Sequence, residues 1–301
     1  MGRAGRLTPD GGPRILVDPR AQERTLDSRI ATIDGVPLRW EETGAGPVVV
    51  LVHGIPTSPE LWRHVVPLLG GARVLAFEML GYGRSILAGT GHDLSIAAQA
   101  RYLNGLLDHL GIEQVVLVGH DLGGGVTQIA AVERPERIAG LVLTNAIAYD
   151  SWPIPSVKLL RAISPLTRRL PAPALKATLG SLLMRGHADL AMARESLEVH
   201  HAQYVAADGA AGLARQVSAL DVNDTLRVAG RLEHLDVPAR VVWGLADQFQ
   251  KAGYGERLAR ALGTRPIGIP GGKHFTPEDH PDIIARATHE LLTPQKGAPD
   301  R

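Results

Sequence analysis

The segment from Val115 to Ala130 constrains the fold more than any other part of this 301-residue chain. It opens with four consecutive aliphatic residues, which are typical of a strand buried on both faces, as in a parallel sheet. It ends in a glycine- and alanine-rich stretch with apolar residues at helical spacing, which predicts a packed helix. The sequence Gly-His-Asp-Leu-Gly (residues 119–123) joins the two and has the form Gly-x-nucleophile-x-Gly. It predicts a sharp strand-to-helix turn that exposes the side chain of Asp121 above the sheet.

The rest of the chain repeats this alternation, which indicates an α/β fold with a mostly parallel central sheet flanked by helices. A β-hairpin is predicted at residues 29–42, where alternating apolar residues surround the turn Asp34-Gly35. Apolar runs predict buried strands at residues 48–52, 74–77, 115–118, 140–145, 239–244 and 266–269. Periodic segments predict helices at residues 58–69, 94–110, 255–262 and 281–292, in addition to the helix after Asp121.

The alternation stops between residues 146 and 235. Prolines there separate short amphipathic helices, and no buried strand is expected. We therefore predict that a helical cap, residues 148–235, is inserted into an α/β core made of residues 29–147 and 236–293. Residues 1–28 are rich in Gly, Pro, Arg and Asp, which predicts a flexible N-terminal arm, and residues 294–301 form a polar tail.

The composition excludes several classes of function. Lys and Arg number 32 against 31 Asp and Glu, so no net field favours nucleic acid or a membrane surface as a partner. The absence of cysteine excludes disulfides, thiolate catalysis and cysteine metal sites. No apolar run has the length of a signal-peptide core or a transmembrane helix, and no phosphate-cradling or metal-ligand motif stands out. We expect a cytoplasmic protein that acts on a small-molecule substrate without a metal or organic cofactor, and no oligomeric state is predicted.

Two further polar residues follow strands whose carboxyl ends should lie near Asp121. Asp247 follows the strand at residues 239–244, and His274 follows the last strand. Sites in open parallel α/β sheets lie at the carboxyl ends of the strands. We therefore predict that Asp121, Asp247 and His274 converge in the roles of nucleophile, acid and histidine.

Each of these three assignments has a competing interpretation. Asp121 could serve only as the N-cap of the helix that follows it. Asn145 ends the strand next to the one that precedes Asp247, but its amide cannot ionise. His280 competes with His274, although it lies in a Pro-Glu-Asp-His-Pro sequence that is typical of a helix start.

Other polar residues are assigned plainer roles. His53 and His120 flank the loops of the site and are expected to be structural. His187 and His200 fall in the cap without metal-like partners in the sequence, and we expect them to be solvated or packed. Glu78 closes a strand and is expected to anchor a loop.

Together with His53-Gly54-Ile55-Pro56, these motifs resemble those of α/β-hydrolases with an aspartate nucleophile, the family that contains epoxide hydrolases and haloalkane dehalogenases. The resemblance covers about residues 29–292, and the cap is similar only in kind. It implies that the backbone N–H groups of Ile55 and Leu122 form an oxyanion hole. The family's form of the loop also suggests a cis bond between Ile55 and Pro56.

An aspartate at this turn implies its own chemistry. A carboxylate is already ionised at neutral pH and can displace a leaving group at a saturated carbon directly, which leaves an alkyl-enzyme ester. His274, oriented by Asp247, would then activate the water that hydrolyses the ester on Asp121.

The leaving group distinguishes the two activities of the family. Haloalkane dehalogenases usually place a tryptophan after the nucleophile and often an asparagine after His-Gly, where this chain has Leu122 and Ile55. Epoxide hydrolases open the ring with tyrosine hydroxyls from the cap. Tyr204 is the better candidate donor and Tyr149 the other, although neither lies at the family's usual spacing. Trp152 could line the pocket or bind a halide.

The sequence therefore favours an epoxide hydrolase that acts on a small to medium apolar epoxide, because the cap supplies mainly apolar side chains. A haloalkane dehalogenase-like hydrolase stays open, since residues 53–62 are dehalogenase-like. A non-catalytic, ligand-binding member of the fold is the third possibility.

Overall fold

The computed structural model describes residues 26–292, and its centre is an eight-stranded sheet with the order β1-β2-β4-β3-β5-β6-β7-β8. The strands are β1 (Asp27–Ile33), β2 (Val36–Gly44), β3 (Val48–Val52), β4 (Arg73–Glu78), β5 (Val115–His120), β6 (Ile138–Thr144), β7 (Ala239–Gly244) and β8 (Pro266–Ile269). β2 is antiparallel to both of its neighbours, whereas the other neighbouring strands pair in parallel. The prediction of a mostly parallel sheet is confirmed.

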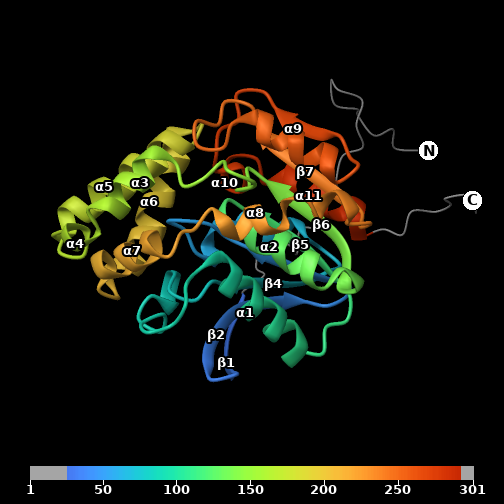
Figure 1. The fold of residues 1–301 in the computed structure, drawn as a ribbon, viewed down its shortest axis with the longest axis horizontal. Helices are drawn as coiled ribbons and strands as arrows, with labels where there is room; N and C mark the ends of the chain where they lie inside the picture. Colours follow the sequence, from blue (N-terminus) through green and yellow to red (C-terminus); the bar gives the residue numbers. More distant parts are fainter. Residues whose placement is uncertain (1–25, 293–301) are drawn as a thin grey trace, which may run out of the picture.

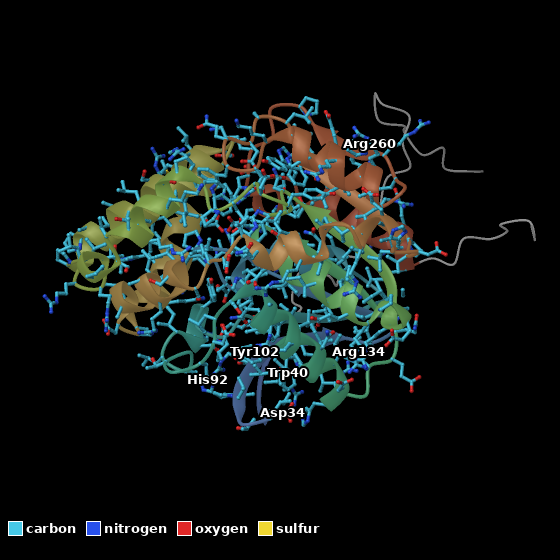
Figure 2. The ribbon with its side chains drawn as sticks, in the orientation of Figure 1. Asp34, Trp40, His92, Tyr102, Arg134 and Arg260 are labelled. Atoms are coloured by element: carbon cyan, nitrogen blue, oxygen red, sulfur yellow. The ribbon has the colours of Figure 1, made fainter. Side chains whose placement is uncertain are left out.

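The hairpin at one edge of the sheet forms as expected. β1 and β2 meet at the turn Asp34-Gly35, where both residues have positive φ angles, 50° and 77°. Figure 2 shows Asp34 at the tip of this hairpin. The first strand begins at Asp27, so the last two residues of the predicted arm belong to the sheet. Residues 1–25 of that arm and the predicted tail at 294–301 lie outside the described residues.

The central strands are continuous apolar runs because both faces of the sheet are covered. In β3, Val50 and Val52 pack into the core on one face, while Val49 and Leu51 pack into the core on the other. All four side chains are fully buried. A strand that alternated apolar with polar residues could not occupy this place.

Helices supply the two covering layers, as Figure 1 shows. The helices are α1 (Ile96–His109), α2 (Leu122–Glu133), α3 (Pro155–Ala162), α4 (Ser164–Thr167), α5 (Ala172–Gly186), α6 (Leu190–Val205), α7 (Gly209–Ser218), α8 (Asn223–Ala229), α9 (Ala252–Ala261), α10 (Thr276–Asp279) and α11 (Pro281–Leu292). α1, α2 and α9 contribute to the core on one face, and α11 contributes to the core on the other.

The predicted helix over residues 58–69 is wrong. The segment instead forms two short 3-10 turns, η2 (Pro59–Trp62) and η3 (Val66–Leu68), and both start at or next to a proline. Pro67 has no N–H to donate and its ring crowds the preceding turn, so one continuous α-helix cannot pass through it.

The chain between β6 and β7 contains α3 to α8 and the 3-10 turn η6 (Leu232–His234), and no strand among these described residues. Figure 1 shows α3 to α7 gathered to one side of the sheet, while α8 lies against α2. We keep the name cap for residues 148–235, whose boundaries stay a prediction. No helix within residues 26–292 has both the length and the apolar character needed to cross a lipid bilayer.

Candidate active site

Asp121 occupies a one-residue turn between β5 and α2. Its φ of 50° and ψ of −119° lie outside the regions that non-glycine residues ordinarily adopt, so the surrounding structure must hold it there. Gly123 allows the turn to close, because a Cβ at this position would lie 2.1 Å from the carbonyl oxygen of Val52. The predicted sharp strand-to-helix turn is confirmed.

Backbone N–H groups surround the carboxylate of Asp121. The N–H of Ile55 donates to Oδ2 at 3.0 Å, and the N–H of Leu122 also bonds to the carboxylate. Burial raises the pKa of Asp121, and the neighbouring His274 and these two N–H groups oppose that rise. The two donors proposed from the sequence as an oxyanion hole are thus brought to this carboxylate, and the Ile55–Pro56 bond is cis.

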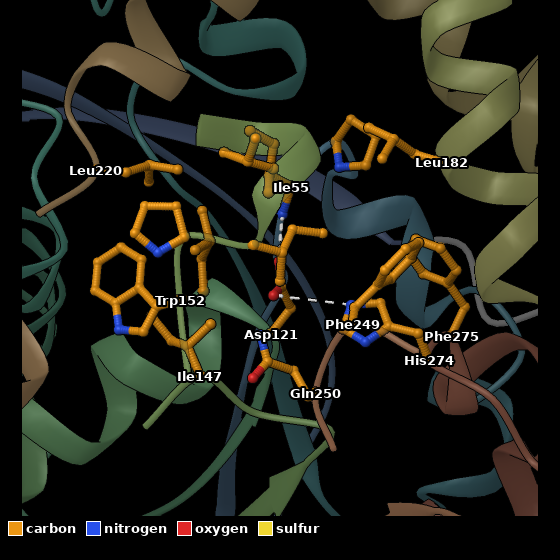
Figure 3. A pocket seen from close by; sticks show the side chains of 15 residues that line it. Ile55, Asp121, Ile147, Trp152, Leu182, Leu220, Phe249, Gln250, His274 and Phe275 are labelled. Atoms are coloured by element: carbon orange, nitrogen blue, oxygen red, sulfur yellow. Dashed lines mark hydrogen bonds and ion pairs between the residues drawn. The ribbon is translucent and has the colours of Figure 1, made fainter. Parts of the chain in front are cut away.

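His274 links the nucleophile candidate to the acid candidate. Its Nδ1 lies 2.9 Å from Oδ2 of Asp247, and its Nε2 lies 3.8 Å from Oδ1 of Asp121, the contact drawn as a dashed line in Figure 3. Burial alone would lower the pKa of His274, but the carboxylates of Asp247 and Asp121 raise it above its ordinary value. The structure therefore brings together all three residues that the sequence proposed as a triad.

Asn145 supports the acid instead of replacing it. It follows β6, and its Nδ2 donates to Oδ2 of Asp247 at 2.7 Å. Its Oδ1 accepts from the N–H of Gly244 at 3.0 Å and from the hydroxyl of Thr276 at 3.1 Å. The sequence marked Asn145 as a rival acid, and its place at the end of the neighbouring strand was the signal for this contact.

A narrow pocket opens above Asp121 between the core and the cap. Its lining is mostly apolar: Ile55, Pro56, Asp121, Leu122, Ile147, Trp152, Pro153, Ile154, Val157, Leu182, Leu220, Phe249, Gln250, His274 and Phe275 (Figure 3). The space open to the centre of a water-sized sphere is about 40 Å³. One water needs about 10–15 Å³ by this measure, so the pocket admits only a small molecule in this conformation.

The cap residues proposed as leaving-group donors are engaged elsewhere. Trp152 lines the pocket, but its indole N–H donates to the hydroxyl of Thr225 at 2.7 Å. Tyr204 is buried, and its hydroxyl donates to Oε1 of Gln216 at 2.8 Å. Tyr149 carries the guanidinium of Arg257 over its ring at 3.6 Å. Neither tyrosine is among the residues that line the pocket.

Gln250 and Phe249 belong to the pocket and were not singled out from the sequence. Phe249 packs edge-on against the imidazole of His274, with ring centroids 5.1 Å apart. Gln250 is buried, and its Oε1 has no hydrogen-bond partner among the described residues. Their nearness to Asp247 in the chain was the available signal, because the loop that carries the acid also lines the pocket.

A second buried cluster of charged groups joins the cap to the core. Glu278 on α10 forms an ion pair with Arg63, and it accepts hydrogen bonds from Nε2 of His187 at 2.7 Å and from Oγ of Ser196 at 2.9 Å. Nε2 of His200 lies 3.6 Å from the same carboxylate. Burial alone would raise the pKa of Glu278, but the hydrogen bond from His187 and the nearby His200 and Arg63 hold it well below its usual range.

The histidines outside the triad are structural, as expected. Nε2 of His53 accepts the N–H of Met79 at 3.1 Å, and burial lowers the pKa of His53 to about 3. Nε2 of His120 lies 3.0 Å from the carbonyl oxygen of His274. His187 and His200 are packed and not solvated, since both are buried in the Glu278 cluster. Over residues 26–292, no group of three or more His, Asp or Glu side chains is arranged to hold a metal ion.

Comparisons with known proteins agree with this geometry. The chain matches the family model described as alpha/beta hydrolase fold over residues 47–281. It is 29% identical to "Haloalkane dehalogenase 2" of Mycobacterium tuberculosis over 272 residues, which cover 84% of this chain and 90% of that protein. It is 43% identical to "Epoxide hydrolase B" of Mycobacterium tuberculosis over 99 residues, which cover 32% of this chain and 28% of that protein.

Among solved structures, an alpha/beta hydrolase fold protein from Burkholderia ambifaria is similar with a TM-score of 0.80 and 27% sequence identity, covering 89% of this chain and 100% of that one. The family match spans most of the sequence and includes every strand from β3 to β8. The chain therefore belongs to the α/β-hydrolase fold family, with relatives named haloalkane dehalogenase and epoxide hydrolase.

Proposed function

We propose that this protein is a hydrolase that forms a covalent alkyl ester on Asp121, with a small apolar epoxide as the leading substrate class. The observation that carries the proposal is that the two oxygens of the Asp121 carboxylate have different neighbours. Oδ2 of Asp121 is held by the N–H of Ile55 at 3.0 Å, whereas Oδ1 faces Nε2 of His274 at 3.8 Å. The small apolar pocket directly above this carboxylate supports a small apolar substrate.

The first step forms the ester. A lone pair on Asp121 Oδ1 bonds to one ring carbon of the epoxide, and the ring C–O bond breaks with its electron pair on oxygen. That oxygen takes the proton from Nε2 of protonated His274. The raised pKa of His274 supports the presence of this proton. Once Asp121 is an uncharged ester, the pKa of His274 falls, which leaves a neutral imidazole as the base.

The second step hydrolyses the ester. Neutral His274 removes a proton from water as the water oxygen attacks Cγ of Asp121, and the N–H groups of Ile55 and Leu122 stabilise the oxyanion. Collapse of this intermediate breaks the bond between Cγ and the alkyl oxygen, which takes the proton of the new carboxyl group. The diol leaves, and the Asp121 carboxylate and protonated His274 are restored.

A haloalkane dehalogenase is the second candidate, favoured by one observation: the relative with that name matches 84% of this chain, whereas the epoxide hydrolase match covers 32%. A halide leaves as an anion and needs no proton, so His274 would pass the proton of water to solvent. The indole of Trp152, the cap's candidate halide donor, already donates to Thr225. This engagement places the dehalogenase second.

Intact mass of a His274→Gln variant tests the proposal, because the second step loses its base. The first step is slowed but not blocked, since water can supply the proton that His274 would give to the epoxide oxygen, and a haloalkane needs none. After incubation with 1,2-epoxybutane, we expect a gain equal to the whole epoxide, located on the peptide that contains Asp121. A gain equal to a butyl group from 1-chlorobutane or 1-iodobutane would establish the dehalogenase instead. The control is Asp121→Asn in the same background, which should gain nothing. No adduct from either class with a folded protein would overturn the ester mechanism and favour a non-catalytic binding role.

A further inference from the structure

The amide of Gln250 is a polar group that the described hydrogen bonds leave unused in an apolar pocket. Its side chain is 2% exposed, and its Oε1 has no hydrogen-bond partner among residues 26–292. The same side chain lines the pocket together with Asp121 and His274. In the view of Figure 3 it lies below the Asp121 carboxylate, whereas His274 lies to the right of it. Buried polar groups are almost always hydrogen-bonded in folded proteins, so this amide needs a partner that enters the pocket.

The backbone around Gln250 is fixed, so the amide is presented to the pocket by a rigid support. The indole N–H of Trp243, a fully buried residue next to the end of β7, donates to the carbonyl oxygen of Gln250 at 2.9 Å. Three residues earlier on the same loop, Oδ1 of Asp247 accepts the N–H of Phe249 at 2.7 Å. One loop therefore positions both the acid behind His274 and this amide.

The other candidate donors for a leaving atom are engaged or distant. The indole of Trp152 donates to Thr225, and the hydroxyl of Tyr204 donates to Gln216. Leu122 has no donor in its side chain. Among the residues that line the pocket, Gln250 is thus the side-chain amide available to a substrate.

We infer that the side-chain N–H of Gln250 binds the atom that leaves the attacked carbon, either the oxygen of an epoxide or a halide. This inference rests on the proposed ester chemistry. As Asp121 Oδ1 forms its bond to carbon, the breaking bond leaves its electron pair on the departing atom, and the amide donates a hydrogen bond to the charge that develops. The amide gives up no proton. The epoxide oxygen receives its proton from His274, and a halide departs as an anion.

The amide also suits the product of epoxide opening. A carboxamide both donates and accepts hydrogen bonds. The ring oxygen accepts one in the substrate, and the hydroxyl that replaces it can also donate one to Oε1. A halide uses the N–H alone.

Gln250→Met tests the inference, because methionine has nearly the same length and shape but cannot donate a hydrogen bond through its side chain. In the His274→Gln background, the rate of ester appearance is followed by intact mass with 1,2-epoxybutane, 1-chlorobutane and 1-iodobutane. With the class of probe that reacts, we expect Gln250→Met to slow ester formation by about 10²-fold, as for the loss of one preorganised donor. If haloalkanes react, the loss should be larger for chloride than for iodide, because chloride is the poorer leaving group.

Gln114→Met is the matched control, since it makes the same substitution at an exposed residue outside the pocket lining. It should change the rate of ester formation only a few-fold. The melting temperature separates a structural role from the inferred one. A structural amide would lower it when replaced, whereas removal of an amide without a protein partner should leave it unchanged or raise it.

The outcomes distinguish this inference from the proposed function. Equal rates of ester formation with Gln250 and with Met at this position would overturn the role of Gln250 and leave the ester mechanism standing. If no probe forms an ester even with Gln250 intact, the proposed function fails, and calorimetric binding of 1,2-butanediol and of bromide decides the role of the amide. Binding that weakens roughly tenfold in Gln250→Met, as for one lost hydrogen bond, supports the contact. Unchanged binding of both ligands overturns it.

Discussion

Nε2 of His274 lies 3.8 Å from Oδ1 of Asp121, on the side of the imidazole opposite to its contact with Asp247. The imidazole therefore sits between two carboxylates, and only one of them changes its charge during the proposed reaction. This geometry lets one histidine act first as an acid and then as a base. The free enzyme favours the imidazolium, and the ester on Asp121 favours the neutral ring.

Asp121→Asn should lower the pKa of His274. Burial lowers this pKa and the charges of Asp247 and Asp121 raise it, so removing one carboxylate destabilises the imidazolium. NMR titration of the imidazole, assigned by its loss in His274→Gln, measures the shift. An equal titration midpoint in both proteins would show that the two groups are not coupled. Substitution of the exposed Asp93 by Asn is the control and should leave the midpoint unchanged.

The coupling of His274 to Asp121 also determines how the free energy of unfolding changes with pH. Because the folded-state pKa of His274 is raised, its contribution to the free energy of unfolding is present below the unfolded value near 6.5 and is lost as pH rises through the folded pKa. The corresponding slope should be smaller in Asp121→Asn than in the unmodified protein. The free energies of unfolding in urea of both proteins, measured from below pH 6.5 upward, give the two slopes.

Asp247→Asn should reduce the rate of ester hydrolysis strongly, by about 10³–10⁴-fold if the acid acts as in a hydrolytic triad. Adding Asn145→Asp should recover part of this loss, since the side chain of residue 145 contacts Asp247 Oδ2 at 2.7 Å, the same atom that lies 2.9 Å from Nδ1 of His274. The rate of ester decay in a single turnover measures the loss in Asp247→Asn and its recovery in the double variant. A double variant no faster than Asp247→Asn would show that a carboxylate at residue 145 cannot orient His274.

Glu278→Gln should destabilise the fold by about 3–5 kcal/mol, because it removes the fully buried carboxylate that pairs with Arg63 and binds His187. Glu195→Gln is the matched control. Glu195 pairs with the same Arg63 at 2.9 Å but is half exposed, so its loss should cost about 0–1 kcal/mol. The free energies of unfolding in urea provide the comparison. Equal and small losses would contradict a structural role for the buried cluster.

The acid stability of the protein should depend on the same residue. The pKa of Glu278 is lowered in the fold, so its contribution is present above the ordinary value of 4.5 and is lost as pH falls toward the folded pKa. As pH falls below 4.5, Glu278→Gln should therefore lose less stability than the unmodified protein.

Gly54→Ala should abolish ester formation while leaving most of the fold intact. A Cβ at this position would lie 2.4 Å from Oδ2 of Asp121, so the carboxylate would have to move away from the N–H of Ile55. Gly253→Ala on α9 is the control, because a Cβ there meets nothing within 4 Å and should stabilise the helix by about 1 kcal/mol or less. Rates of ester formation and melting temperatures are the measurements. Full activity in Gly54→Ala would contradict the tight packing around the nucleophile.

The sequence predicted the parts of this molecule that local pattern determines. The turn at Asp121, the positions of Asp247 and His274 after two strands, and the run of helices between β6 and β7 all follow from short motifs and hydrophobic periodicity. The two N–H groups that the family resemblance proposed as an oxyanion hole also lie at the carboxylate of Asp121, because backbone groups next to a motif are fixed once its turn is fixed.

Side-chain direction in the cap could not be predicted in this way. Tyr204 donates a hydrogen bond to Gln216, and Trp152 donates one to Thr225. Both side-chain directions depend on how the cap helices pack against each other and on the core. The position of Gln250 in the pocket could not be predicted for a related reason. Only the folded loop shows that its side chain is buried and that its Oε1 has no hydrogen-bond partner among the described residues. Pro67 did offer a warning in the sequence, and the helix over residues 58–69 was extended across it.

Isotope transfer in a single turnover tests the ester mechanism most directly. The unmodified enzyme, in excess over 1,2-epoxybutane or over the haloalkane that reacts, is allowed one turnover in H₂¹⁸O, and the product and the peptide containing Asp121 are analysed by mass spectrometry. If water attacks Cγ of an ester, the heavy oxygen enters the carboxylate of Asp121, and the product carries the oxygen that Asp121 supplied. A first-turnover product that carries the heavy oxygen, with an unlabelled Asp121 peptide, would show that water attacks the substrate directly and would contradict the covalent role of Asp121.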